Sequence, residues 1–403
     1  MMRTPASGAL LIMLFGLYSV AWGQTVHQAP KGILAGAFYI FPSLELAYKQ
    51  DDNIFALAEN EVEDQVTTAR AGLELVSNWS NHFLAIKGNA EMGSYSREKK
   101  EDYLDIGFSG SGRIDILRGV YLGLNLGASQ THEERGSPND LFGSEPARFS
   151  LVSGGVSFSH EISVLQLNAA FKADNYAYED TPTSALIDVD QKGRNRLQIE
   201  GTTRLSLVVM GLNSIFVQGK YFARDYEFRD KAAYGFDRNS TGFEVTAGYK
   251  RKISDVSMFE IQFGQREQQY VDEDLPDISG VQAAGILKWL PSPMTSIMLH
   301  VNRSIEESIM KDVSGYFSTN YGAAIDQEFL SIFLLKASFQ RNDLDYHGSD
   351  RTDNISSLSA GLYMFMMEYI QIGVSYDYMD RESTDPAMAY QRSVSRVVLT
   401  GRI

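Results

Sequence analysis

The sequence of 403 residues contains no cysteine, which excludes disulfide scaffolds, cysteine-based zinc sites, thiol catalysis and a lipid-modified N-terminal cysteine. Histidine is scarce, with 6 residues, and positive charge is in deficit, because 36 Lys and Arg are set against 51 Asp and Glu. The resulting net charge of -15 argues against a general nucleic-acid-binding protein. Beyond residue 24, no stretch approaches the roughly 18 consecutive apolar residues that a membrane helix needs.

The residues that are abundant indicate a sheet protein. The chain has 34 Gly, 21 Tyr and 22 Phe, while its overall hydrophobic fraction of 44% is ordinary. Many Gly and Tyr with few long apolar runs is an unusual mixture for a soluble enzyme. It is typical of a sheet whose two faces meet different solvents.

The N-terminus has the pattern of a secretory signal peptide. One arginine precedes an almost wholly apolar run from Gly8 to Val20, and Ala21 and Gly23 are small residues at the positions that a signal peptidase reads. We expect a signal peptide over residues 1–23, cleaved after Gly23, followed by a short periplasmic segment over 24–37. An uncleaved membrane anchor is the alternative, for which the apolar run is short.

The rest of the chain alternates apolar and polar residues with a period of two. In Ala69–Leu75 one face carries Ala and Leu while the other carries Arg70, Gly72 and Glu74. This alternation predicts strands with one apolar face and one face that is exposed to water. We expect eighteen strands, near 38–50, 64–79, 83–96, 101–115, 119–132, 148–161, 164–178, 193–209, 214–228, 239–252, 256–270, 279–290, 294–307, 316–328, 331–345, 352–367, 369–381 and 388–403.

The connections between these strands decide between a soluble sandwich and a membrane barrel. Short turns such as 80–82 and 211–213 alternate with long polar loops such as 51–63 and 133–148. A sandwich has no reason to sort its connections in this way, whereas an outer-membrane barrel with both termini in the periplasm does. We therefore predict an all-β, transmembrane, antiparallel up-and-down barrel over 38–403. Sixteen strands would result if a weak pair around 279–307 were misassigned.

The wet face of the predicted strands carries many basic residues. Reading each strand in phase places more bases than acids inside, although the chain as a whole is acidic. Rings of Lys and Arg are a means of building anion-selective pores. The alternative is that these charges pair across strands and merely solvate the wall. The bases that we predict to line the substrate pathway are Arg70, Lys87, Arg113, Lys172, Arg196, Arg204, Lys220, Arg224, Lys250, Arg266, Lys336 and Arg396.

No pattern in the sequence indicates an enzyme. No serine lies in a G-x-S-x-G motif, and no P-loop, dinucleotide fingerprint or HExxH motif occurs. The acidic run Asp51–Asp52–Asn53 lacks the spacing of a calcium loop. We expect no catalytic residues, no cofactor and no metal site.

The first predicted strand and loop resemble a known family. The run Phe41–Pro42–Ser43–Leu44–Glu45–Leu46–Ala47–Tyr48, followed by Asp51–Asp52–Asn53–Ile54–Phe55, is similar to the start of the barrel in the putative β-barrel porin 2 family. The segment Glu134–Arg135–Gly136, after Leu126–His132, is also similar to that family. The resemblance implies a location in the outer membrane of a Gram-negative cell and a frequent association with exopolysaccharide or capsule biosynthesis.

On this resemblance we expect a channel that takes part in export of an exopolysaccharide or capsular polysaccharide, with an acidic polymer passing a basic lumen. The alternatives are a general or solute-specific diffusion porin for small anions and, third, a structural or adhesive barrel. The partners we expect are outer-membrane lipids and lipopolysaccharide, the barrel-assembly machinery and periplasmic polysaccharide-export components. Nucleic acid is not among them.

Overall fold

The computed structural model describes residues 30–140, 143–182, 188–228, 236–254, 256–308, 310 and 313–403. The predicted signal peptide, residues 1–23, lies outside the described residues, so its cleavage stays a prediction. Within the described ranges, no helix is long and apolar enough to cross a membrane.

Nearly all of the described chain belongs to one 19-stranded antiparallel sheet, made of the short β1 (Ile33–Ala35) and eighteen long strands. The long strands are β2 (Phe38–Asp51), β3 (Asp64–Ser77), β4 (Phe83–Tyr95), β5 (Tyr103–Leu117), β6 (Val120–His132), β7 (Arg148–Ile162), β8 (Leu165–Tyr178), β11 (Arg196–Met210), β12 (Asn213–Tyr226), β13 (Ser240–Lys252), β14 (Met258–Tyr270), β15 (Ile278–Ser292), β16 (Thr295–Glu307), β17 (Gly315–Phe329), β18 (Phe333–His347), β19 (Thr352–Met367), β20 (Ile370–Ser383) and β21 (Tyr390–Arg402).

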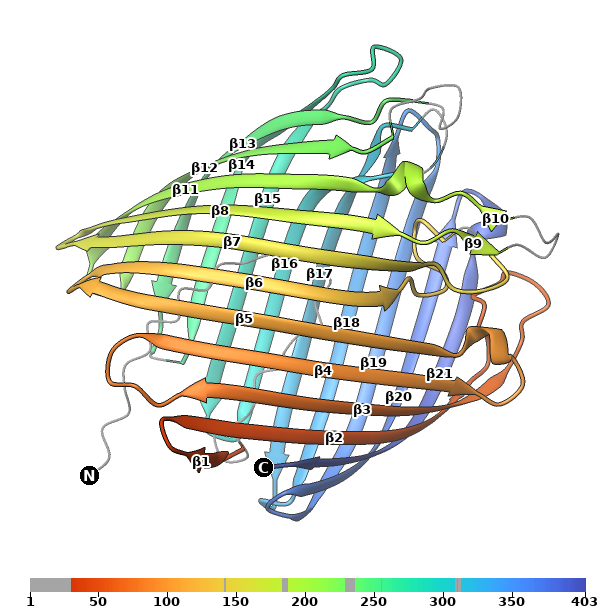
Figure 1. The fold of residues 1–403 in the computed structure, drawn as a ribbon, viewed down its shortest axis with the longest axis horizontal. Helices are drawn as coiled ribbons and strands as arrows, with labels where there is room; N and C mark the ends of the chain where they lie inside the picture. The colour runs from red at the N-terminus through yellow and green to blue at the C-terminus, as the bar shows by residue number, and fades with distance from the viewer. Residues whose placement is uncertain are drawn as a thin grey trace.

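Each long strand pairs with its neighbours in chain order, and β21 returns to pair with β2 from Ser43↔Arg402 to Asp51↔Val394. The sheet is therefore a closed barrel (Figure 1). Closure is what a lipid environment requires of a sheet. An open edge in lipid leaves unpaired backbone N–H and C=O groups at a cost of several kcal/mol each.

The predicted strands are confirmed in number and place. Every long strand overlaps its predicted range, with both ends within three residues of the prediction. The count of eighteen long strands among the described residues decides against sixteen. Among the described residues, sequence reasoning missed only small elements. These are β1, a two-stranded hairpin of β9 (Thr181–Pro182) and β10 (Asp188–Val189), and the short 3-10 helices η2 (Lys99–Glu101), η3 (Lys192–Arg194) and η4 (Pro386–Met388).

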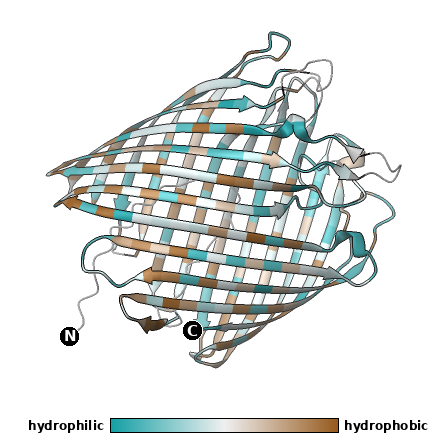
Figure 2. Ribbon diagram, viewed as in Figure 1, coloured by the Kyte–Doolittle hydropathy of each residue, from teal (hydrophilic) through white to brown (hydrophobic). Residues whose placement is uncertain are grey.

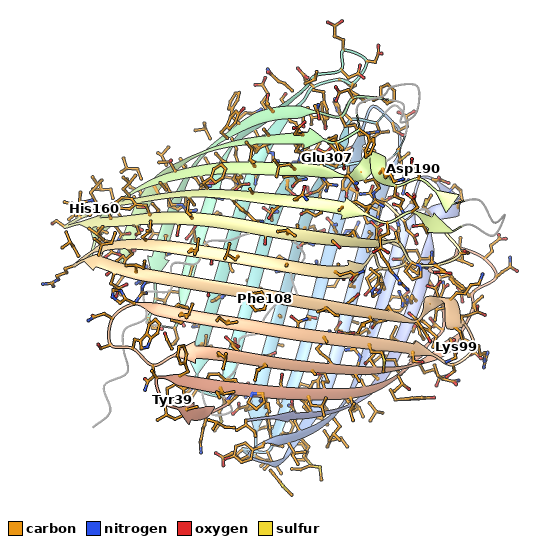
Figure 3. All side chains as sticks on the ribbon, viewed as in Figure 1. Tyr39, Lys99, Phe108, His160, Asp190 and Glu307 are labelled. Carbon is orange, nitrogen blue, oxygen red and sulfur yellow. The ribbon has the colours of Figure 1, made fainter. Side chains whose placement is uncertain are left out.

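The two rims of the barrel differ as predicted. His160 lies near the rim of short turns, whereas Lys99 and Asp190 lie at the opposite rim of long loops (Figure 3). The two ends of the sheet meet at the short-turn rim, where the Ile403 N–H donates to the Pro42 carbonyl at 3.3 Å. In an outer-membrane barrel the short-turn rim faces the periplasm and the long loops face outward.

The outer face of the wall is apolar. Hydrophobic and hydrophilic residues alternate along the strands (Figure 2). Outward side chains such as Phe108 and Val217 are more than half exposed in the isolated chain. Aromatic side chains mark the short-turn rim, where the rings of Phe38 and Trp79 lie 5.6 Å apart. An apolar band with aromatic borders is the surface that a lipid bilayer covers.

Candidate functional site

The inner face of the wall is the candidate site, because it is where the predicted pathway residues lie. In one row around the barrel, Glu45 is opposite Arg70, Arg70 is opposite Glu91 and Glu91 is opposite Asp105. Residues directly opposite in an antiparallel pair share a face. The same register places all twelve predicted bases on the inner face, across β3 to β21.

Most of these bases form ion pairs with carboxylates, which is the alternative that the sequence left open. Ten of the twelve lie within 4.0 Å of a carboxylate. The pairs are Arg70–Glu91, Arg113–Asp115, Lys172–Asp174, Arg204–Glu260, Lys220–Glu200, Arg224–Glu307, Lys250–Glu260, Arg266–Glu244, Lys336–Asp326 and Arg396–Asp377. Their role in a substrate pathway stays a prediction, but the wall that they form is largely neutralised.

Lys87 and Arg196 are the two predicted bases with no ion pair to a described carboxylate. Lys87 lies opposite Glu74 in the ladder and lines the main cavity. The Arg196 guanidinium stacks 4.3 Å from the ring centroid of Tyr176 and donates to the Arg194 carbonyl at 3.0 Å. Any free positive charge at these bases is therefore local rather than spread along the lumen.

The sequence-based tally of charges on the inner wall omitted residues of both signs close to the strand ends, including the bases Arg381 and Arg392. Sequence reasoning overlooked inward acids close to strand ends, among them Asp115, Glu306 and Asp353. Asp51, at the end of β2, was assigned to a solvated loop, but its carboxylate accepts from the Arg392 guanidinium at 2.6 Å. These acids were missed because strand ends are the least certain part of a period-two pattern.

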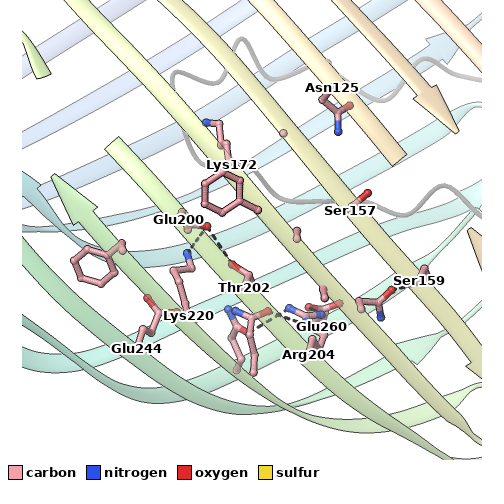
Figure 4. Close-up of a pocket in the computed structure, with 18 of the residues that line it drawn as sticks. Asn125, Ser157, Ser159, Lys172, Glu200, Thr202, Arg204, Lys220, Glu244 and Glu260 are labelled. Atoms are coloured by element: carbon pink, nitrogen blue, oxygen red, sulfur yellow. Dashed lines mark hydrogen bonds and ion pairs between the residues drawn. The ribbon is translucent and has the colours of Figure 1, made fainter. Parts of the chain in front are cut away.

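The lumen contains a cavity of about 860 Å³. It is bordered by inward side chains from β3 to β16 and reaches the short-turn rim at Gly211–Asn213. In Figure 4 the acids and bases alternate across its wall: Glu200 accepts from Thr202 and pairs with Lys220, while Arg204 pairs with Glu260.

Uncharged polar groups and aromatic rings fill the spaces between those pairs. Side chains of Ser, Asn and Gln line much of the cavity, including Asn125, Ser157 and Ser159 in Figure 4. The Arg204 guanidinium lies 4.0 Å from the ring centroid of Phe216, and that of Arg266 lies 4.2 Å from Phe222. Hydroxyl and amide groups both donate and accept hydrogen bonds, so this wall is suited to an uncharged polar solute.

The long-loop rim contains a different arrangement of charge, centred on Asp353 at the start of β19. Asp353 is 0% exposed, and its carboxylate accepts from Arg351 at 2.8 Å, Arg381 at 2.7 Å, Tyr346 at 3.1 Å and Ser383 at 2.5 Å. Burial, the largest single cause, would lower the pKa of Arg351, but the hydrogen bond to Asp353 and the nearby negative charges together leave that pKa raised. The Arg351 guanidinium therefore stays charged inside the barrel.

A long loop is attached to this cluster. Arg381 donates from Nη1 to the carbonyl of Gly136 at 3.0 Å, although Gly136 belongs to the connection between β6 and β7. Gly136 has φ of +78°, and a Cβ there would lie 2.7 Å from the Ala56 Cβ and from the Tyr390 hydroxyl. Only glycine fits this position without strain. We call Arg351, Asp353, Arg381 and the Gly136 carbonyl the mouth network.

The neighbouring residue fixes the same loop from its other side. Arg135 donates to both carboxylate oxygens of Glu101, at 2.9 and 2.5 Å. Glu101 is the last residue of the short helix η2 (Lys99–Glu101). Burial, the largest single cause, lowers the pKa of Arg135, but the hydrogen bond to Glu101 and the charges of Glu101 and Asp140 together raise it, so the net direction is upward. The Asn139 side chain then donates to the Glu307 carbonyl at the end of β16 at 3.3 Å. Residues 133–140 thus reach from β6 to β16 and β20, across the mouth.

A small apolar core completes the closure. Tyr316 and Tyr346 lie with ring centroids 5.0 Å apart and pack with Val313 and Leu344. The Arg238 guanidinium donates to the Val313 carbonyl at 3.0 Å, which ties this core to the loop before β13. A packed core of four buried side chains therefore lies at the mouth, while the cavity extends along the wall from Gly211–Asn213 to Arg224 and Glu306, near the long-loop ends of β12 and β16.

Sequence reasoning missed every member of the mouth network as a functional residue. The segment Glu134–Arg135–Gly136 was noted only for its resemblance to a family. A glycine after an arginine in a long loop was the only signal available, because the partners Asp353 and Arg381 lie more than 200 residues away. Within the described part of the chain, no group of acidic and histidine residues has the arrangement of a metal site.

Comparisons with known proteins extend this description. The family model described as "Putative beta-barrel porin 2" matches residues 28–403. No curated protein matches the chain.

Solved outer-membrane proteins resemble the chain only in general shape. The OccK2 (OpdF) structure from Pseudomonas aeruginosa has a TM-score of 0.48 at 7% identity, over 91% of this chain and 97% of its own. OpdO from the same organism has a TM-score of 0.46 at 12% identity, over 94% and 99%. The siderophore receptor PirA from Acinetobacter baumannii has a TM-score of 0.47 at 8% identity, over 90% and 80%. Likenesses at this level carry no weight for function.

Proposed function

The chain belongs to the putative beta-barrel porin 2 family and is an outer-membrane β-barrel of the porin class, and from this premise we propose that it is a channel for the export of a polysaccharide. The observation that carries the proposal is the asymmetry of the lumen. The cavity reaches the short-turn rim at Gly211–Asn213, whereas residues 133–140 cross the opposite mouth. Among the described residues no loop crosses the short-turn end of the cavity, so a solute arriving from the periplasm would enter there, and its release would require the mouth network to open.

The chemistry of the wall supports carbohydrate as the solute. Paired charges leave little net field to attract or repel an ion, while Ser, Asn and Gln side chains offer donors and acceptors for hydroxyl groups. The polymer therefore need not be acidic, which widens the expectation drawn from the sequence. Delivery would fall to periplasmic export components, and lipopolysaccharide would surround the outer rim.

Single-channel conductance of the refolded barrel in a planar bilayer tests the proposal, with maltohexaose and oligogalacturonate as neutral and acidic probes. We expect small openings in the native chain and larger ones when the mouth network is broken by Asp353→Ala. Both oligosaccharides should block the open variant transiently, and more strongly from the short-turn side. Openings that neither oligosaccharide blocks would overturn export. Silence in both proteins would indicate a structural barrel.

A diffusion porin for small anions is the second candidate, favoured by Lys87. This base lines the cavity without an ion pair to a described carboxylate. The reversal potential in a salt gradient separates the two functions. Strong anion selectivity that Lys87→Gln abolishes, with no block by oligosaccharides, would favour the porin.

A further inference from the structure

One seam of the barrel wall is not fully paired. The ladder between β15 and β16 stops at Ala283↔Arg303. If the register continued, Gln282 would pair with Ser304 and Val281 with Ile305. No residue of the described segment Ile278–Gln282 is paired with a residue of the described segment Ser304–Glu307. We call these two segments the β15–β16 fork.

The fork is not the frayed end of two strands. On its other side, β15 stays paired with β14 up to Gln268↔Ile278, and β16 stays paired with β17 up to Glu307↔Gly315. Both strands therefore continue in the wall while separating from each other. An unpaired stretch of backbone is energetically unfavourable beside lipid. Because β15 and β16 both stay paired with their other neighbours, the separation between them indicates a functional role.

The fork lies at the upper border of the apolar band. The outward side chain of Phe263, opposite Ala283 where the β15–β16 ladder ends, is 57% exposed, and that of Val281, inside the fork, is 58% exposed. At its own level the outward residues of β14 are polar, Gln265 and Glu267. The separation therefore opens at the level where lipid headgroups meet acyl chains.

Two apolar side chains fill the fork. Ile305 follows the outward alternation of Leu299 and Val301 but is only 2% exposed. The ring of Phe317, which lies opposite Ile305, extends to β15, where a Cβ on Gly280 would be 2.7 Å from it. Glycine at position 280 thus leaves the space that the ring occupies. We call Ile305 and Phe317 the wedge.

The wedge separates the lumen from the outside of the barrel. Gln282, Ser304, Ile305 and Glu306 all border the cavity that contains the paired charges. On the outside, the Arg303 guanidinium lies 4.4 Å from the ring centroid of Phe317 and donates to the Thr319 hydroxyl at 2.7 Å. Among the described carboxylates, none forms an ion pair with Arg303. A cation thus stands at the outer entrance of an apolar passage to a polar cavity.

We propose that the β15–β16 fork is a lateral binding site for a single-chain anionic amphiphile of the outer leaflet. The acyl chain takes the place of the wedge side chains between the two strands, and the anionic headgroup binds Arg303. This site is independent of polysaccharide export, because it joins the lumen to the membrane rather than to the periplasm. Arg303 suits the headgroup because guanidinium binds phosphate through paired hydrogen bonds.

Photolabelling of the refolded full chain in liposomes tests the site. The probe is a lysophosphatidylglycerol with a diazirine at the end of its acyl chain, and adducts are mapped by mass spectrometry. We expect adducts on Asn302–Glu306 and on Phe317, and several-fold more on the cavity-lining residues Asn302 and Ser304 in Phe317→Ala. Adducts confined to outward residues such as Leu299, unchanged in Phe317→Ala, would overturn the proposal.

Matched variants separate the site from general effects on the barrel. Phe339→Ala removes an outward phenylalanine of β18 and should leave the adduct pattern unchanged. Phe317→Leu preserves most of the packing and should give the same direction with a smaller effect, should Phe317→Ala fail to fold. Arg303→Gln should reduce labelling by the anionic probe several-fold, but should not reduce labelling by an uncharged monoacylglycerol that carries the same diazirine chain. Equal labelling by both lipids in both proteins would overturn the role of Arg303.

Discussion

The wall and the mouth of this barrel use the same residue types in opposite ways. On the wall, pairs such as Arg396–Asp377 leave both side chains about one third exposed to the lumen. At the mouth, Arg381 and Asp353 are 1% and 0% exposed and each has several partners. The exposed wall pairs solvate a polar surface, although Arg224–Glu307 and Arg266–Glu244 are at most 11% exposed. The mouth network connects loops that are far apart in the sequence.

This difference in burial predicts a difference in strength. Exposed ion pairs contribute about 0–1 kcal/mol, because water competes for both partners. Removing one member of a buried pair costs about 3–5 kcal/mol, because the remaining charge is left without a partner. Stability and closure should therefore depend on the mouth, and ion selectivity on the wall.

The largest effect is expected for Asp353→Ala. This change leaves Arg351 and Arg381 buried without their carboxylate and should destabilise the mouth by about 3–5 kcal/mol. Single-channel recordings should show larger and longer openings. The control is Asp377→Ala on the wall, which removes the partner of Arg396 and should change closure little. Equal effects of the two variants would abolish the distinction between wall and mouth.

A smaller effect is expected for Gly136→Ala. A side chain at φ of +78° costs about 1–2 kcal/mol, and the added Cβ would also collide with Ala56. Hydrogen exchange of residues 133–140 should become faster without loss of the barrel. Gly201→Ala is the control, because a Cβ there meets nothing within 4 Å. Unchanged exchange in Gly136→Ala would mean that the loop is not fixed at this residue.

The role of the wall is tested by variants that change its net charge, with ion selectivity rather than stability as the measured quantity. Lys87→Gln removes a base without an ion pair to a described carboxylate, so the pore should become more cation-selective. The reversal potential in a salt gradient should shift by about a few millivolts, because one charge changes little in a wide pore. The double variant Arg396→Gln/Asp377→Asn removes a pair that shares no residue with another ion pair, and it should shift the reversal potential less. A larger shift in the double variant would show that paired charges still set selectivity.

The smallest effect is expected outside both regions. Lys31 and Glu368 form an ion pair at the short-turn rim with both side chains exposed. Lys31→Ala should leave urea-induced unfolding in lipid vesicles unchanged, because water and salt screen such a pair. A lower unfolding midpoint would indicate that the β1 hairpin anchors the barrel.

Much of the fold could be predicted because a period of two is a local signal. The alternation in Ala69–Leu75 needs only neighbouring residues, and it is confirmed within β3. The inward direction of Arg204 or Lys220 follows from the same phase, and the register confirms it. Whether those bases are free or paired could not be predicted, since Glu260 comes from a strand 56 residues further along.

Residues close together in the chain specify the strands, their alternation and the sorting of short turns and long loops, and hence a barrel. The contacts of Gly136 with Arg381 across the mouth, of Arg204 with Glu260, and of Phe317 with Gly280 emerge only when the strands are assembled. These contacts join residues that only closure of the barrel brings together, and no local pattern encodes them.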